Sequence, residues 1–158
     1  MLKEWLGMAD GILQDLHRDH EQISALIEQL LKNESSAERA PLFKEMMGML
    51  LAHSHAEQNV LYKKMEKSGD EKVRSFALEG TNEHQIVEQQ LQQMARARNK
   101  ASEQWTAQLN VLRELVSHHI KEEESTGFGC ARAEFDRDEL AKLGEQFKRQ
   151  KEKLMAEA

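Results

Sequence analysis

The chain has 158 residues, of which 32% are charged and 39% hydrophobic, and its net charge at pH 7 is −6. This length suits one compact domain, and the negative charge without a broad basic cluster argues against a nucleic-acid-binding protein. A mean hydropathy of −0.73 and the absence of a long apolar run in the sequence argue against a membrane span, and the short, charged N-terminus is unlike a signal peptide.

The cysteine and proline content indicates the cellular compartment and the fold class. The single cysteine, Cys130, has no partner for an internal disulfide and fits a reducing compartment, so we expect a cytoplasmic protein. One proline and many Glu, Gln, Lys, Leu, Ala and Met residues predict an all-α fold.

The first long helix is expected from about Asp10 to Asn33. Before it, we expect an irregular or short helical segment whose Trp5 and Leu6 could cover one end of a bundle. The apolar residues of the helix recur at intervals of three or four: Leu13, Leu16, Ile23, Ile27 and Leu30. His20 falls inside this stripe, so the buried face of the helix should include an imidazole.

The second helix is expected from about Ala37 to Glu66, with Pro41 near its start because proline is tolerated in a first turn. Its inward face is predicted to consist of Leu42, Met46, Met49, His53, Glu57 and Val60. A histidine and a glutamate four residues apart thus occupy positions where the pattern asks for apolar side chains.

The third helix follows a break at residues 68–70 and is expected to end near Arg98. Its predicted inward face consists of Val73, Ala77, Gly80, His84, Leu91 and Met94. Glu88 follows His84 by four residues and lies on the same side of the helix.

The fourth helix is expected to begin after Ser102, a predicted N-cap, and its inward face should consist of Trp105, Leu109, Leu112, Val116, His119 and Glu123. Residues 127–129 are expected to stop it, with a glycine in the left-handed conformation. A fifth amphipathic helix, at about 136–156, is expected outside the others because its remaining faces are densely charged. Short connections then predict one domain, an up-down-up-down antiparallel four-helix bundle over about residues 10–130 with an accessory C-terminal helix.

Each of the four bundle helices therefore places one histidine on its inward face, and two of them add a glutamate one turn later. At about 1.5 Å of rise per residue, these side chains lie in the same half of the bundle and can converge. Imidazole with carboxylate suits iron, manganese or zinc, and six ligands with two glutamates fit two ions better than one. The predicted ligands are His20, His53, Glu57, His84, His119 and Glu123.

Alternative interpretations stay open for several residues. A hydrogen-bonded network of histidines and glutamates without metal would require every group to be satisfied, and four histidines at matching depth favour metal. Glu88 is either a third metal carboxylate or a hydrogen-bond acceptor, and His17 either neighbours the ligands or lies at the boundary of the core. Glu122 and Glu124 are expected to be solvated, with Glu124 the substitute ligand if the last turn tightens or loosens.

These motifs resemble those of hemerythrin-like (HHE cation-binding) domains over about residues 10–130. The resemblance is carried by residues 16–20 (LHRDH), 53–62 (HSHAEQNVLY), 83–84 (EH) and 118–124 (HHIKEEE) with Phe128. It implies a non-haem di-iron centre with carboxylate and oxo or hydroxo bridges, rather than manganese or zinc. It also implies that the ligand is dioxygen and, in some relatives, nitric oxide or peroxide.

The sequence also departs from that family. Oxygen-carrying hemerythrins have a second histidine where Glu88 stands here, and Gly129 replaces a common proline. The set of four histidines looks more like bacterial relatives implicated in nitrosative stress and iron-centre repair, which usually carry a further N-terminal cysteine-containing domain that we do not expect here.

The predicted function is therefore a di-iron protein that binds or senses dioxygen or nitric oxide, without turnover and without nucleic-acid or membrane partners. The alternatives are a di-iron enzyme (peroxide or nitric oxide reduction, ferrous oxidation or iron-centre repair) and a structural bundle without metal.

Overall fold

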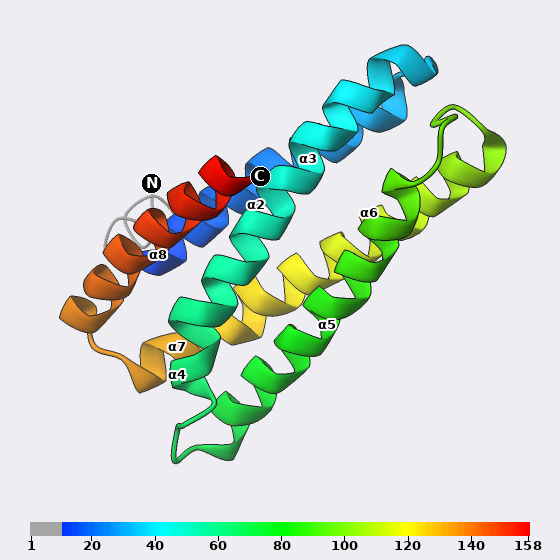
Figure 1. Ribbon diagram of the computed structural model, residues 1–158. Helices are drawn as coiled ribbons and strands as arrows, with labels where there is room; N and C mark the ends of the chain where they lie inside the picture. The colour runs from blue at the N-terminus through cyan, green and yellow to red at the C-terminus, as the bar shows by residue number, and fades with distance from the viewer. Residues whose placement is uncertain (1–10) are drawn as a thin grey trace, which may run out of the picture.

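The computed structural model describes residues 11–158, and every regular element in that part of the chain is a helix, which confirms the all-α prediction (Figure 1). The helices are α2 (Ile12–Lys32), α3 (Ser36–Glu57), α4 (Lys63–Met65), α5 (Glu71–Ala95), α6 (Glu103–Glu122), α7 (Phe128–Glu134) and α8 (Arg137–Glu157). Two π-helical segments, Gln58–Tyr62 and Glu123–Gly127, join α3 to α4 and α6 to α7 without a break. The expected lead-in with Trp5 and Leu6 lies outside the described residues.

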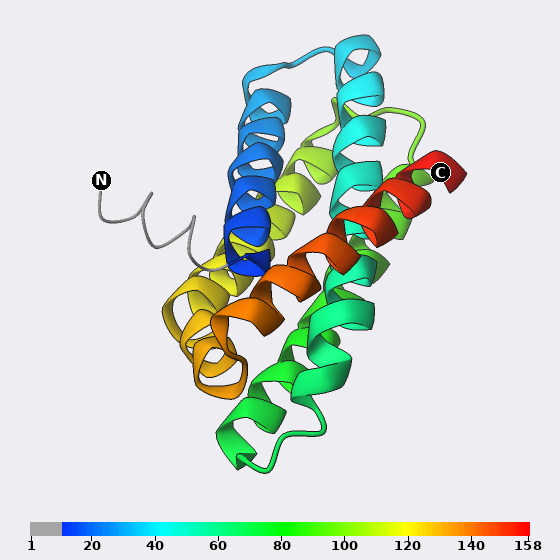
Figure 2. The same cartoon turned by 90° about the vertical axis from the view of Figure 1, so that its left-hand side faces the viewer.

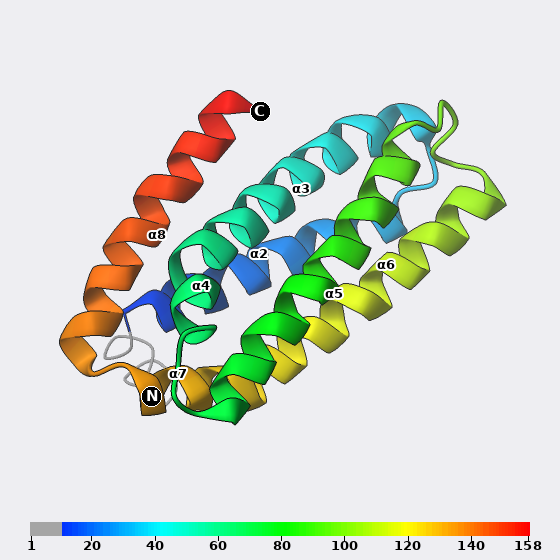
Figure 3. The ribbon, with the colours of Figure 1, turned by 60° about the horizontal axis from the view of Figure 1, so that its bottom comes forward.

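Four long stretches lie side by side: α2, α3 with α4, α5, and α6 (Figures 1 and 3). Helix α2 contacts α3 and α6, and α5 contacts the same two helices on the other side. Helix α8 lies outside this group and crosses α2 and α3, both of which it contacts (Figure 2). Within residues 11–158, no helix combines the length and the apolar composition that crossing a membrane requires.

Side-chain caps start three of the long helices. Asp70 accepts the backbone N–H of Lys72 before α5, and Ser102 accepts that of Trp105 before α6, as predicted. Asp136 and Glu139 form a reciprocal capping box before α8. The sequence thus supplies its own start signals where the connections are short.

The buried apolar residues form two clusters with a polar layer between them. The first cluster includes Leu13, Leu16, Tyr62, Phe128, Leu143 and Phe147. The second cluster includes Ile23, Ile27, Met46, Leu91, Trp105 and Leu112. In α2 the change from one cluster to the other falls between Leu16 and Ile23, where Asp19 and His20 are buried.

The predicted helix end at residues 127–129 is wrong. Gly127 has a φ of −61°, and the helix continues through the π-helical segment into α7 until Phe135 adopts an extended backbone. A β-carbon on Gly127 would overlap the ring of Phe76 on α5. The glycine therefore permits a close approach between two helices and does not form a left-handed turn.

Pro41 also lies deeper in its helix than expected. Helix α3 begins at Ser36, so the proline stands in the second turn and cannot donate to the carbonyl of Ala37. Both residues are exposed, and water can satisfy that carbonyl. The helix tolerates the proline because its missing hydrogen bond faces solvent.

Candidate metal centre

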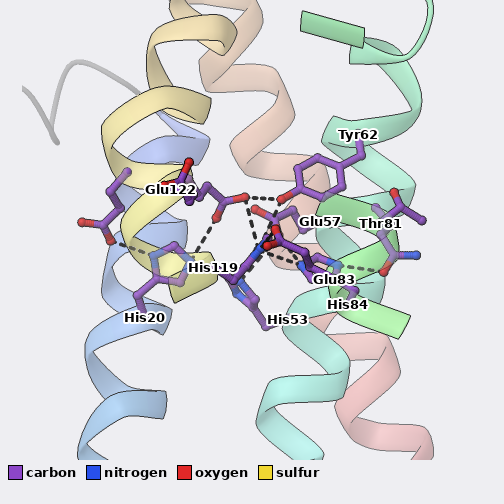
Figure 4. Close-up of polar contacts among 12 residues, drawn as sticks. His20, His53, Glu57, Tyr62, Thr81, Glu83, His84, His119 and Glu122 are labelled. Carbon is purple, nitrogen blue, oxygen red and sulfur yellow. Dashed lines mark hydrogen bonds and ion pairs between the residues drawn. The ribbon is translucent and has the colours of Figure 1, made fainter. Parts of the chain in front are cut away.

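The polar layer between the two apolar clusters contains all six residues predicted as metal ligands. They are His20 from α2, His53 and Glu57 from α3, His84 from α5, His119 from α6, and Glu123 from the following π-helical segment. Each of them is buried, with an exposed fraction of at most 8%. In Figure 4, His53, Glu57, His84 and His119 are turned toward one another, and Tyr62 reaches them from another side.

The inward atoms of these residues form two groups, each of two histidines and one glutamate. The groups are His20, His53 and Glu123 in one, and Glu57, His84 and His119 in the other. In each group, one nitrogen or oxygen from every residue lies within 4.8 Å of the others. Each glutamate also approaches the other group, since Glu57 Oε1 is 3.8 Å from His53 Nε2 and Glu123 Oε2 is 3.9 Å from His119 Nε2. Both carboxylates therefore lie where they could bridge two ions.

All four histidines are oriented in the same way, with Nδ1 outward and Nε2 inward. The acceptors of their Nδ1–H groups are Glu124 for His20 (2.7 Å), Asp19 for His53, Gln58 for His84 and Glu83 for His119 (2.8 Å each). An oxygen at Nδ1 places the proton there, so each Nε2 can present a lone pair to the layer. Metal-binding histidines need this arrangement.

Several inward atoms form no hydrogen bond of good geometry, and this tests whether the layer fits a metal. Among the described residues, four buried polar atoms accept or donate no hydrogen bond: His20 Nε2, both carboxylate oxygens of Glu57, and Glu123 Oε1. The Nε2 atoms of His84 and His119 lie 3.1 Å apart. Two nitrogens bound at right angles to one ion, at about 2.1 Å, would be about 3 Å apart. Because buried polar atoms without a hydrogen bond are costly, this layer fits bound cations better than it fits a hydrogen-bonded network without metal.

The two buried carboxyl groups respond differently to their surroundings when no cation is bound. Burial and the negative charge of Glu123 raise the pKa of Glu57 well above its usual value. Burial also acts to raise the pKa of Glu123, but His20 beside it holds that pKa well below its usual value. In the metal-free layer, Glu57 is therefore the carboxyl group that takes up a proton first as the pH falls.

His20 lies between two carboxylates, with Nε2 3.1 Å from Glu123 Oε1 and Nδ1 bonded to Glu124. Burial alone would lower the pKa of His20, but these two carboxylates raise it to about 9. His84 behaves in the opposite way, since burial and the neighbouring His119 lower its pKa well below the usual value. A metal ion bound at His20 must therefore displace a proton.

Tyr62 belongs to the layer although the sequence pattern did not indicate it. Its buried hydroxyl donates to Oε2 of Glu123 and lies 3.5 Å from Nε2 of His119. Burial and the nearby carboxylates raise the pKa of Tyr62 well above its usual value. Hydrogen bonds in a π-helix join residues five apart, so Tyr62 lies about one turn from Glu57 on the same side. At α-helical spacing, Tyr62 would instead be expected to point away from the inward face of the helix.

The outer acceptors of the histidines were also missed. Burial alone would raise the pKa of Asp19, but hydrogen bonds from His53 and Lys151 hold it below its usual value. The hydrogen bond from His119 likewise lowers the pKa of Glu83. The need of every metal-binding histidine for an acceptor at Nδ1 is the signal that could have found them.

Glu124 is only partly solvated, and although the last turn is loosened, this residue lies in neither group of candidate ligands. Its side chain is 28% exposed and accepts hydrogen bonds from both His17 and His20. The π-helical turn that begins at Glu123 brings this neighbouring carboxylate to the edge of the layer. His17, with a side chain 42% exposed, thus neighbours the candidate ligands at the boundary of the core.

Glu88 lies outside both groups. Its carboxylate is 30% exposed and accepts a hydrogen bond from His55 Nε2 at 3.2 Å. The structure therefore gives Glu88 the role of a hydrogen-bond acceptor on the other side of α3 and α5.

A cavity of about 20 Å³ adjoins the histidine side of the layer. Besides the four histidines and Ser54, its walls are apolar and consist of Ile23, Leu50, Val87, Val116 and Ile120. This volume holds about one water-sized molecule. A small apolar ligand could therefore lie against the layer without meeting a charged wall other than the histidines.

Comparison with known proteins gives two matches. Residues 11–131 match the model of the hemerythrin HHE cation-binding domain, so α8 lies outside the matched region. The chain is also 27% identical, over 150 residues, to a DNA nickase of Nostoc sp., with 92% of this chain and 40% of that protein covered. The chain thus spans 40% of the length of that relative. No solved structure matches.

Proposed function

The chain belongs to the family of hemerythrin HHE cation-binding domains, and from this premise we propose that it is a non-haem di-iron protein that binds or senses dioxygen or nitric oxide. The observation that carries the proposal is the pair of buried groups, each with two histidines and one glutamate. The proposal takes α2, α3 with α4, α5 and α6 as an up-down-up-down four-helix bundle, which the contacts of α2 and α5 with both α3 and α6 support.

The composition of the two groups supports iron. Two histidines and one carboxylate are the protein ligands of many non-haem iron sites that keep positions open for a small molecule. In this layer the ligands would be His20, His53, Glu57, His84, His119 and Glu123. Bound iron would supply one-electron chemistry toward a diatomic gas.

The protein itself contributes orientation and exclusion of water. The outer acceptors direct each Nε2 inward, and the hydroxyl of Tyr62 holds one oxygen of Glu123. The cavity offers a diatomic gas an apolar space beside the histidines. Its described walls carry one non-ligand polar side chain, Ser54, and so offer little for delivering protons to a bound gas, which favours reversible binding over reduction.

The proposal also covers the location of the protein and the activity of its relative. The single cysteine supports a cytoplasmic location. The activity named for the Nostoc relative is not carried over, because the chain spans 40% of that protein and has a net charge of −6.

An anaerobic titration with ferrous iron tests the proposal. We expect about two ions per chain, because a preformed set of His and Glu ligands should fill. Oxygen added to the loaded protein should produce a visible charge-transfer band that disappears under vacuum. Irreversible decay of the band with consumption of peroxide would instead indicate an enzyme, and less than about one ion per chain would exclude a metal protein.

Substitutions then test which residues bind the ions. His119→Ala and Glu57→Ala should lower the iron content, because each removes one member of a group of three. His55→Ala is the matched control, since this histidine lies on α3 but pairs with Glu88 outside the groups. An equal loss of iron from all three variants would contradict the assignment.

A further inference from the structure

Helix α8 reaches the histidine layer although it lies outside the region matched by the family model. The ring of Phe147 packs edge-on against the ring of His53, with centroids 5.8 Å apart. One turn later, Nζ of Lys151 donates to Oδ1 of Asp19 at 2.6 Å. The other oxygen of Asp19 accepts the Nδ1–H of His53 at 2.8 Å. Two hydrogen bonds in series therefore connect α8 with one of the four histidines.

The position of α8 against α2 is closely constrained. Leu140, Leu143 and Phe147 are buried in the first apolar cluster. At Gly144, an added β-carbon would lie 3.0 Å from the backbone nitrogen of Ile12, so the glycine allows the two helices to approach at backbone distance. This packing places Lys151 beside Asp19, so a small shift of α8 would change the distance between these two side chains.

Asp19 needs both of its partners. The residue is 4% exposed, and a buried carboxylate is costly unless its oxygens are hydrogen-bonded. Lys151, whose side chain is 22% exposed, satisfies one oxygen and thereby turns the other toward His53. Without the ammonium group, the carboxylate could rotate to seek water and release the imidazole.

We propose that Lys151 is a positioning residue for the group formed by His20, His53 and Glu123. It orients the Asp19 carboxylate, and Asp19 in turn holds His53 with Nε2 directed into the layer. Among the described residues, the outer acceptors of the second group, Gln58 and Glu83, make no hydrogen bond to α8. The two metal positions therefore differ, because one depends on the accessory helix and the other does not. This role presupposes the function proposed above, since it requires ions at both groups.

The full chain with Lys151→Met tests this role in an anaerobic ferrous titration. Loss of a partner of this kind typically weakens metal binding by about 10- to 100-fold, and Lys151 acts one step further out, so we expect one of the two binding steps to weaken by about tenfold. The other step should stay unchanged. Lys148→Met is the matched control, because it removes the same charge from α8 but pairs with Asp15, at 3.7 Å. Equal weakening in both variants would overturn the proposal in favour of a general charge effect.

Two further measurements separate positioning from a loss of folding. In the metal-free protein, nitrogen NMR should show that the proton of His53 stays on Nδ1 in the wild type and in Lys151→Arg. In Lys151→Met, the signals of the two ring nitrogens should be averaged, because Asp19 no longer holds the Nδ1–H. In an Asp19→Asn background, Lys151→Met should have no added effect on iron binding. If the wild type binds less than one ion, the proposed function fails. If it binds two, and Lys151→Met also binds two with unchanged affinities, the role of Lys151 alone is refuted.

Discussion

The ring of Tyr62 occupies the space that a β-carbon on Gly80 would need. Such a carbon would lie 2.7 Å from Cε2 and 2.9 Å from the hydroxyl oxygen of the tyrosine. Gly80 stands in the middle of α5, where glycine is otherwise unfavourable in a helix. The missing side chain on one helix thus makes room for the hydroxyl that contacts Glu123 from another.

Gly80→Ala should therefore destabilise the protein although alanine favours helices. We expect a loss of about 1–3 kcal/mol in the free energy of unfolding by urea, because the buried Tyr62 ring has to move. Gly48→Ala on α3 is the control, because a β-carbon there meets nothing within 4 Å. This control should gain about 0.5–1 kcal/mol. A similar gain for Gly80→Ala would show that Tyr62 is not held where the structure places it.

Glu57→Gln should stabilise the chelated protein while lowering its iron content. Folding of the metal-free protein raises the pKa of Glu57. The contribution of this side chain to stability is therefore present below its unfolded pKa and is lost as the pH rises through its folded pKa. Glutamine resembles the protonated form, and at pH 7 we expect a gain of about 1–2 kcal/mol on unfolding by urea. Glu88→Gln, outside the groups, should change neither quantity. Lower stability of Glu57→Gln would contradict the picture of an uncompensated carboxyl.

The contribution of His20 to the stability of the chelated protein should disappear in alkaline solution. Its folded pKa of about 9 exceeds the usual 6.5, so the contribution is complete below pH 6.5 and declines as the pH rises through 9. The difference in unfolding free energy between the wild type and His20→Gln should then shrink by about 3 kcal/mol from pH 6 to pH 9.5. His118→Gln is the comparison, because the side chain of His118 is 65% exposed. A difference that stays constant with pH would argue against the pairing of His20 with two carboxylates.

Val116→Ile should impair gas binding without removing iron. Val116 lines the cavity and is 5% exposed, so one added methyl group occupies most of the space beside the histidines. Overpacking of this kind costs about 1–3 kcal/mol, and we expect the oxygen affinity read from the visible band to fall by about tenfold. Val111→Ile adds the same group on α6 at a position that is 51% exposed, and it should behave as the wild type. Unchanged affinity in Val116→Ile would place the gas elsewhere.

The helices and the six candidate ligands could be predicted because they follow one rule. Each predicted ligand continues an apolar stripe at α-helical spacing, as His20 does between Leu16 and Ile23. Burial on four helices then implies that the side chains meet. This reasoning reaches as far as the α-helical period holds.

The rest of the layer depends on features that the period does not describe. Tyr62 and Glu124 lie in π-helical segments, where the spacing of one face changes. Asp19 and Glu83 acquire their roles from histidines on other helices, and no local pattern specifies such pairs. The prediction that the fourth helix ends near Gly127 was wrong because glycine is suited both to close packing of helices and to left-handed turns.

The two π-helical segments also determine where these helices can lose one residue. Each of them, Gln58–Tyr62 and Glu123–Gly127, comes at or just after the glutamate of a His-x-x-x-Glu motif. A π-helical turn holds one residue more than an α-helix needs, so deleting one residue there would restore an α-helix and leave the residues beyond it on their present face. Deleting one residue from the α-helical part of α3 or α6 would instead rotate everything beyond it by about 100°, and the apolar residues of α4 or α7 would then face away from their cluster. Insertions and deletions at the connections, such as residues 66–70, also leave these faces in place, and length variation among relatives should be concentrated at the connections and the two π-helical segments.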